Sequence, residues 1–271
     1  MNRQFTLPGN VLSLFLCGGL LGLTALLSPA LLPAGALMVG SEFAAQRLDR
    51  RRVFLGSLLI GVVATLVISP WILRNYRALG GFVPLRSNFG LELAIGNNPL
   101  ADGKTFSSHN KEEQRPLNAL HPFSNPAERA RLVSVGELAY MREKQRDALR
   151  YMSEHPAETM RLTLARTRHY WFPKSDMWSP RTTARHLKSL IYGLVGAGAL
   201  LNLVYLAATK HDRTWLFAAA LIGPSLVYLM THIHPRYCYP TFGICTLLAF
   251  DLLESVRRRS IARPALSPGQ D

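Results

Sequence analysis

The 271-residue sequence has little cysteine. Cys17 and Cys245 lie inside apolar stretches, Cys238 lies close to the end of one, and no two of the three have CxxC spacing. The cysteines therefore indicate neither a disulfide framework nor a metal cluster.

Common catalytic signatures are also absent. The sequence contains no Walker loop, no nucleophile elbow and no HExxH motif. On sequence grounds, this excludes P-loop nucleotide hydrolysis, hydrolase chemistry of the nucleophile-elbow type and a helical zinc protease.

Acidic residues are scarce beside basic ones. The 17 Asp and Glu against 31 Lys and Arg give a formal net charge of +14. In a soluble protein such an excess would suggest nucleic-acid binding. Here many of the cations flank apolar blocks, where they fix topology and meet anionic headgroups. We therefore expect membrane lipids as partners and no nucleic acid.

Apolar residues are concentrated in blocks, which predict an all-α integral membrane protein with about five transmembrane helices. The blocks are Val11–Val39, Val53–Leu73, Leu190–Ala208, Thr214–Met230 and Tyr239–Leu253. Because the first block contains Pro29 and Pro33, we expect a spanning or partly re-entrant segment kinked at the prolines. A signal peptide is the alternative, but its apolar core would be too long.

The basic clusters between the blocks predict the orientation. Arg47 and Arg50–Arg52 lie in a short loop, which the positive-inside rule places in the cytoplasm, with the N-terminus outside. Alternation then puts Lys210, Arg213 and Arg257–Arg259 in the cytoplasm and His232–Tyr237 outside. Every short basic cluster falls on one side, which supports five spans.

The predicted organisation has four parts. Residues 1–73 hold two transmembrane segments, and residues 74–187 form a large extracytoplasmic loop. Residues 188–256 hold three transmembrane helices, and residues 257–271 form a basic, disordered cytoplasmic tail.

Helix signals recur within the large loop. Asn125-Pro126 and His155-Pro156 each precede a glutamate in the first turn of a predicted helix, and the second helix runs into Tyr170, Trp171 and Phe172. These patterns predict two amphipathic helices on the outer face of the membrane. A small soluble subdomain is the alternative.

Two polar segments, Arg74–Asp102 and His232–Tyr237, flank helix ends on the predicted outer side. In a compact bundle we expect them to converge on one site. Arg74 and Arg236 are the preferred ligands for a lipid phosphate, and snorkelling to the interface is the alternative role. The other candidate substrate-binding residues come from the same segments: Arg86, Asn88, Asn97, Asn98, His232, His234 and Tyr237.

Catalytic and metal-binding groups are less defined. Glu92 and Asp102 are candidate carboxylates for general-base work, although loop sequence between them does not define their separation. His232-x-His234 resembles a metal pair, yet helical spacing would point the two rings apart, so no metal or other cofactor is indicated. Asn97-Asn98-Pro99 is typical of a turn.

Three stretches carry a resemblance to a known family. They are SPWILRNYRALGGFVPLRSNFGLELAIGNNPLADG, HPFSNPAERARLVSVGELAYMREKQRDAL and HPRYCYP. Together they resemble the C-terminal half of bacterial family 39-type membrane glycosyltransferases. That family is similar to protein O-mannosyltransferases and to the aminoarabinose transferases of lipid A, with a GT-C fold. The resemblance runs from about Gly18 to Leu253 and implies a partial GT-C fold in a bacterial inner membrane.

The resemblance also implies a reaction. Such enzymes take a sugar from a polyprenyl-phosphate donor and pass it to a protein, lipid or polysaccharide acceptor at the outer face. An acidic residue in the first outer loop acts as base, whereas Glu42 and Asp49, the acidic residues among the first 52, belong to the predicted cytoplasmic loop. We therefore expect the catalytic acid in an N-terminal part missing from this chain, so its own catalytic residue is unknown.

Three hypotheses follow from the sequence. The first is a fragment of a glycosyltransferase, whose activity on its own is uncertain. The second is a non-catalytic membrane protein that binds polyprenyl-phosphate lipids or a partner subunit. The third is a small transporter, which ranks last because the spans offer only isolated Ser and Thr residues and Asn202 as polar groups.

Overall fold

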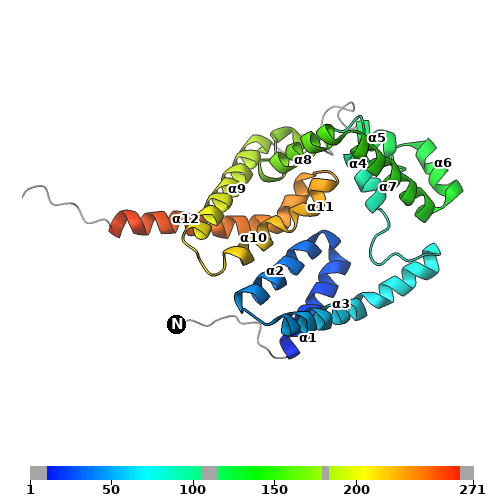
Figure 1. Cartoon of the computed structure of the whole chain (residues 1–271). Coiled ribbons are helices and arrows are strands. Elements are labelled where there is room, and N and C mark those ends of the chain that lie inside the picture. Colours follow the sequence, from blue (N-terminus) through cyan, green and yellow to red (C-terminus); the bar gives the residue numbers. More distant parts are fainter. Residues whose placement is uncertain (1–10, 105–114, 179–182, 263–271) are drawn as a thin grey trace, which may run out of the picture.

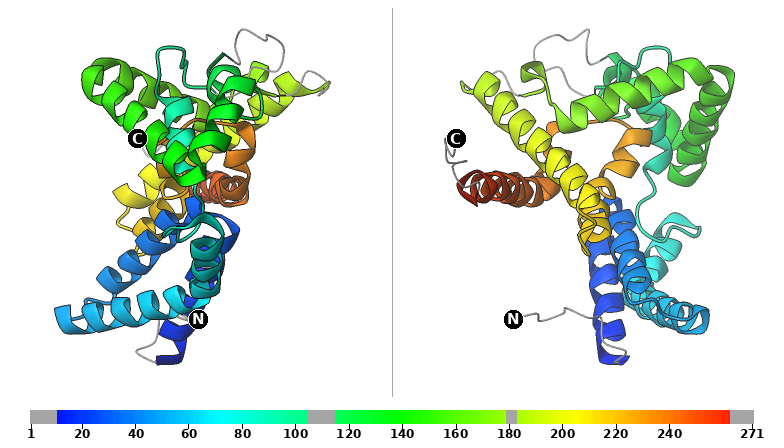
Figure 2. Two further views of the ribbon diagram at one scale, coloured as in Figure 1. Left: turned by 90° about the vertical axis from the view of Figure 1, so that its right-hand side faces the viewer. Right: turned by 60° about the vertical axis from the view of Figure 1, so that its left-hand side comes forward.

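The computed structural model describes residues 11–104, 115–178 and 183–262, and this part of the chain is helical (Figure 1). The one β-type pairing among these residues is an isolated parallel bridge between Lys104 and Ile233. The predicted all-α class is therefore confirmed for the described chain. The helices α1–α3 project from one end of the molecule, and α4–α8 lie at the opposite end (Figure 2).

The first apolar block forms two helices, α1 (Val11–Leu27) and α2 (Leu32–Ala45), joined by the 3₁₀ turn η1 (Pro29–Leu31). The break lies at Pro29, one of the two prolines at which the sequence predicted a kink, and the chain leaves the α1 helix at Ser28, whose backbone is extended. Proline lacks the amide hydrogen needed to continue a helix, so the break falls at Pro29.

Helix α3 (Arg50–Leu79) runs beside α1 in the same direction. Gly18 of α1 contacts Val63 of α3, and Gly22 contacts Val67. Residue numbers therefore increase in the same direction along both helices. This spacing is a GxxxG seam, in which missing side chains let two backbones approach closely. The start of α1 therefore lies at the same end of the pair as Arg50, an arrangement that the sequence prediction of opposite sides did not anticipate.

Helix α3 is longer than the predicted span. Asp49 caps its start by accepting a hydrogen bond from the Arg52 amide at 2.8 Å, and Gly80, with a left-handed φ of 69°, ends it. The helix continues through Pro70, so Arg74 lies on its last turns and not in a polar loop.

The region predicted as one large loop holds five α-helices among its described residues. They are α4 (Phe89–Gly96), α5 (Arg115–Leu120), α6 (Pro126–Val135), α7 (Glu137–Glu154) and α8 (Pro156–Trp171), followed by the turn η2 (Ser175–Met177). The predicted cap is present, since Asn125 accepts a hydrogen bond from the Ala127 amide. Gly136 has a left-handed φ of 83° and divides what the sequence predicted as one helix into α6 and α7.

These helices pack on one another. Leu91 and Ile95 of α4 are buried with Tyr140 of α7. Leu93 of α4 is buried with Ala148 of α7 in a second cluster. The sequence did not predict α4, yet it is the central helix of the region. A shared core of this kind favours the alternative of a small subdomain over two separate helices lying on a membrane.

The C-terminal part contains α9 (Arg185–Ala208), α10 (Thr214–Ile222), α11 (Ser225–Met230), η3 (Pro235–Cys238) and α12 (Tyr239–Ala262). Helices α9 and α12 run parallel, because Tyr192 stacks on Phe242 and, farther along both, the Asn202 amide donates to Leu248. Helix α12 passes the predicted end at Leu253, so Arg257–Arg259 belong to this helix and not to a disordered tail.

Two of the described helices, α3 and α9, are long and apolar enough to cross a membrane. In their most apolar windows only 11% and 22% of the residues are buried, whereas the core helix of a soluble protein would be mostly buried. The other apolar helices are shorter or, as in α12, carry several charges. The number of five spans stays a prediction.

Candidate functional site

Two of the predicted polar segments meet at Glu92 and His232. The Glu92 Oε2 atom lies 3.3 Å from Nδ1 of His232, although this contact does not have hydrogen-bond geometry. The Asn88 amide, one turn earlier on α4, donates to Glu92 Oε1 at 2.8 Å. We call the cluster of Arg86, Asn88, Glu92, His232, Arg236 and Tyr237 the Glu92–His232 site.

Close backbone contact brings α4 to this position. A Cβ atom on Gly96 would overlap the carbonyl of Thr231, and one on Gly90 would overlap the carbonyl of Met141 on α7. Only glycine allows these approaches. The bridge between Lys104 and Ile233 holds the following chain against the same segment.

Arg166 of α8 links the chain segment that carries Glu92 to the chain segment that carries His232. Its Nη1 atom donates to the carbonyl of Leu229 at 2.8 Å, and its Nη2 atom donates to the carbonyl of Gly96 and to Oδ1 of Asn97. The side chain is buried, and burial lowers its pKa to about 10, so it remains charged at neutral pH. A cation suits the carbonyl ends of two helices, here α4 and α11.

Arg86 is held in place by the end of α3. The indole of Trp71 and the buried amide of Asn75 both donate to the carbonyl of Leu85, at 2.8 and 3.2 Å. Arg86 follows this anchored residue, and its guanidinium donates at 3.4 Å to the carbonyl of Leu27, where α1 ends.

Arg236 comes from the second polar segment. It is exposed, and its guanidinium lies 5.4 Å from the centre of the Tyr237 ring. Tyr237 stacks on Tyr228 of α11 with 4.1 Å between ring centres and an angle of 6° between the planes. His234 opens the turn η3 by accepting the Arg236 amide, so it shapes this segment.

Burial and nearby charges determine the protonation of Glu92 and His232. Burial raises the pKa of the Glu92 carboxyl, against the opposing effects of the Asn88 hydrogen bond and the Arg236 and Arg86 guanidiniums. Burial also lowers the pKa of His232 to about 4, so its imidazole is neutral at pH 7. The Nδ1 atom of the neutral ring faces Glu92, and the Nε2 atom lies 3.5 Å from the Tyr237 hydroxyl. Two guanidiniums that act on one carboxylate give the site the positive charge to attract an anion, and Glu92 can exchange a proton.

Several sequence-predicted residues lie elsewhere. Arg74 is exposed on α3, with its guanidinium 5.0 Å from the Trp71 ring and bonded to Asn75. Arg86, rather than Arg74, therefore accompanies Arg236 beside Glu92. Arg74 could not be separated from Arg86 by sequence alone, because both follow an apolar block within a basic segment.

Asp102 is not joined to Glu92 by any contact in the described chain. Its Oδ1 atom accepts the Lys104 amide, and its charge acts on His169, whose pKa burial lowers to about 4. Lys104 in turn pairs with Asp176 at 2.9 Å. The two candidate carboxylates thus belong to different clusters.

Asn97 and Asn98 have structural contacts. The buried Asn97 amide donates to the carbonyls of Leu93 and Met230, and Asn98 bonds its own turn, as the sequence pattern predicts. Both also line a cavity of about 240 Å³ between α4 and α7. Among the described residues no group of three or more His, Cys, Asp or Glu side chains is arranged to hold a metal ion.

Arg166 is the main residue of this region that the sequence interpretation missed. The signal was present, because Arg166 falls four residues after Leu162 and four before Tyr170, on a face that carries apolar side chains. Comparison with protein-family models, with curated proteins and with solved structures produced no match.

Proposed function

We propose that this chain is part of a multi-pass membrane glycosyltransferase that binds a polyprenyl-phosphate sugar donor at the Glu92–His232 site and passes the sugar to an acceptor at the outer membrane face. The observation that carries the proposal is that Arg86 and Arg236 both act electrostatically on the Glu92 carboxylate, which lies 3.3 Å from His232. Guanidiniums are the preferred protein ligands of phosphate, and two of them match its charge.

The chemistry follows from the groups in place. Arg86 and Arg236 bind the donor phosphate, which leaves when an acceptor hydroxyl attacks the anomeric carbon. The family resemblance puts the catalytic acid outside this chain, and the proposal departs from that expectation by assigning the proton of the attacking hydroxyl to Glu92. The raised pKa of Glu92 suits a group that receives a proton. The stacked rings of Tyr228 and Tyr237 present an apolar surface for the sugar or the prenyl chain.

A membrane orientation is part of the proposal. The arginines near the start of α3 lie in the cytoplasm, so α3 crosses outward and delivers Arg86 to the outer face. Because α1 is parallel to α3, it also runs outward, and α2, which follows α1 in the chain, returns inward. Helices α9 and α12, which are parallel, both run inward, so η3 lies on the outer side with the site.

Binding of the phosphate can be measured directly. We expect radiolabelled polyprenyl phosphate to bind the purified chain in detergent, and Arg86→Gln and Arg236→Gln to weaken this binding each by about 10–100-fold, the effect of losing a charged hydrogen bond. Arg77→Gln is the matched control, because Arg77 is exposed at the end of α3 and removal of its charge leaves the site intact.

Arg74→Gln separates two forms of the hypothesis. If Arg74→Gln leaves the affinity for polyprenyl phosphate unchanged, Arg86 and Arg236 are the phosphate ligands. If it weakens binding as much as Arg236→Gln does, Arg74 and Arg236 are the ligands, as the sequence predicted. Equal affinity of the wild type and of both site variants for polyprenyl phosphate would overturn the proposal.

A binding protein without catalytic activity is the second candidate. One observation favours it: both Glu92 oxygens already lie close to other side chains, Oε1 with Asn88 and Oε2 near His232. Sugar transfer from polyprenyl-phosphate mannose and from polyprenyl-phosphate aminoarabinose distinguishes the two. Transfer that Glu92→Gln abolishes without weakening donor binding supports the enzyme, and tight donor binding with no transfer by the wild type supports the binding protein.

A further inference from the structure

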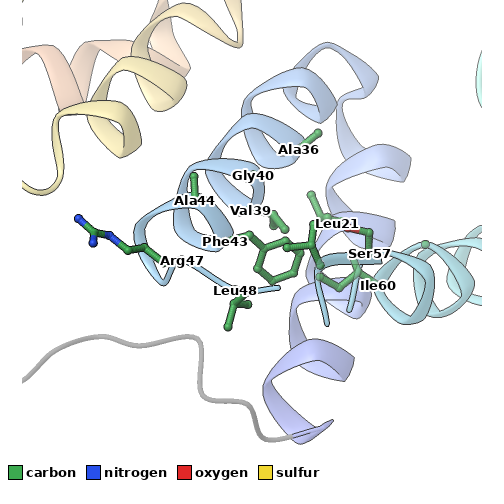
Figure 3. A pocket seen from close by; sticks show the side chains of 12 residues that line it. Leu21, Ala36, Val39, Gly40, Phe43, Ala44, Arg47, Leu48, Ser57 and Ile60 are labelled. Carbon is green, nitrogen blue, oxygen red and sulfur yellow. The ribbon is translucent and has the colours of Figure 1, made fainter. Parts of the chain in front are cut away.

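Residues of α1, α2, α3 and the loop between α2 and α3 line an open apolar cavity that contains none of the residues of the Glu92–His232 site. Its volume is about 550 Å³, within the range of small-molecule sites (Figure 3). Small and aliphatic side chains, one phenylalanine, one serine and one arginine form its wall: Leu21, Ala36, Val39, Gly40, Phe43, Ala44, Arg47, Leu48, Val53, Ser57, Ile60 and Gly61.

Two glycines leave this space open. A Cβ atom on Gly40 of α2 or on Gly61 of α3 would meet no atom within 4 Å. By contrast, Gly18 and Gly22 of α1 press directly on α3. Glycine is unfavourable inside a helix. Close helix packing explains the presence of glycine at positions 18 and 22, but not at positions 40 and 61.

Positive charge gathers at one end of the cavity. Arg47 lines the mouth and extends away from Phe43, which fills the centre of the wall (Figure 3). Arg50 and Arg51 are exposed nearby on the first turn of α3. The segment carries four arginines, Arg47 and Arg50–Arg52, against the two acidic residues Glu42 and Asp49, so a cationic excess remains.

We propose that this cavity binds one acyl chain of an anionic glycerophospholipid, with the phosphate headgroup beside Arg47. An apolar wall disfavours a sugar, and cations confined to one end match an amphiphile that has an apolar tail and an anionic head. The proposal rests on the membrane placement of the proposed function, but not on glycosyl transfer or on the Glu92–His232 site.

Filling the cavity tests the proposal. The chain is reconstituted in nanodiscs of dioleoylphosphatidylcholine and dioleoylphosphatidylglycerol, and the lipids retained after release into detergent are counted by native mass spectrometry. We expect preferential retention of phosphatidylglycerol. The double variant Gly40→Leu with Gly61→Leu should lower retention by about tenfold, as expected when about two methylenes are displaced from an apolar site.

Gly19→Leu is the matched control. Gly19 also lies in open space on α1, but it does not line the cavity, so retention should equal that of the wild type. Circular dichroism and gel filtration check that each variant folds, and both cavity substitutions replace glycine by a better helix former.

The headgroup contact is tested separately. Arg47→Gln should reduce phosphatidylglycerol retention by about fivefold, the contribution of one basic residue at an anionic membrane surface. Arg77→Gln, at the other end of α3, should not change it. The proposal is overturned if phosphatidylcholine is retained equally well, or if the filled, folded variant still retains phosphatidylglycerol. Polyprenyl phosphate binding by that same variant reports independently on the Glu92–His232 site.

Discussion

The α1–α3 pair and the α4–α8 region are both helical, but different contacts hold them together. Gly18 and Gly22 bring the backbones of α1 and α3 into contact, while the leucines Leu20 and Leu66 remain 64% and 65% exposed on the outside. In α4–α8 a core of apolar side chains, among them Leu91, Leu93 and Leu162, is buried, and polar groups are buried with them. Apolar surface turned outward suits a lipid environment, and apolar surface turned inward suits water.

Buried polar groups give the second region its specificity. Lys144 pairs with Glu128 at 2.8 Å, and Glu128 also accepts the Tyr140 hydroxyl at 2.8 Å, so three side chains connect α6 with α7. Arg166 does the same for α4, α8 and α11 through backbone carbonyls. Removal of one member of such a cluster destabilises the protein, because the remaining polar groups stay buried without a hydrogen-bond partner.

The largest effect is expected from Arg166→Met in the polar region. The change leaves the carbonyls of Gly96 and Leu229 and the Asn97 side chain without their donor, and we expect a loss of about 3–5 kcal/mol in the free energy of unfolding. Thermal unfolding in detergent measures it. Arg168→Met, an exposed neighbour on α8, is the control. An unchanged melting temperature in Arg166→Met would show that α4 is held by apolar packing alone.

A smaller effect is expected from Gly22→Leu in the α1–α3 pair. The added side chain meets Val67 and the carbonyl of Ala64, which forces the helices apart at a cost of about 2–3 kcal/mol. Gly19→Leu, one turn away and in open space, should unfold like the wild type. If both variants behave alike in thermal unfolding, the seam does not hold the pair.

The smallest effect concerns pH. His169 is buried and its pKa is lowered to about 4, so the folded protein does not take up the proton that the unfolded chain binds below about pH 6.5. His169 alone should therefore lower the free energy of unfolding by about 1–2 kcal/mol as the pH drops from 7 to 5, in addition to the contributions of His232 and His234, whose pKa values are also lowered to about 4. His169→Gln should show a shallower pH dependence of the melting temperature. An identical slope in the variant would mean that His169 is protonated in the folded state.

Local signals in the sequence predicted much of the helical structure. Asn125-Pro126 and His155-Pro156 mark the starts of α6 and α8, because capping depends on a few neighbouring residues. The convergence of the two polar segments was also predicted, and it holds for Glu92 and His232. The break at Pro29 was predicted as a kink. The length of α3 was not predicted, since Pro70 is carried inside this helix.

By itself, the sequence determined where apolar blocks and helix starts occur and on which segments the candidate site residues lie. Only the tertiary structure decided that Arg86 and not Arg74 stands beside Glu92, that Asp102 belongs to another cluster, and that Arg166 is buried. The reason is physical: these outcomes depend on backbone approaches such as that of Gly96 to Thr231, between residues far apart in the chain. Composition and periodicity describe one helix at a time and carry no information on which helices make such contacts.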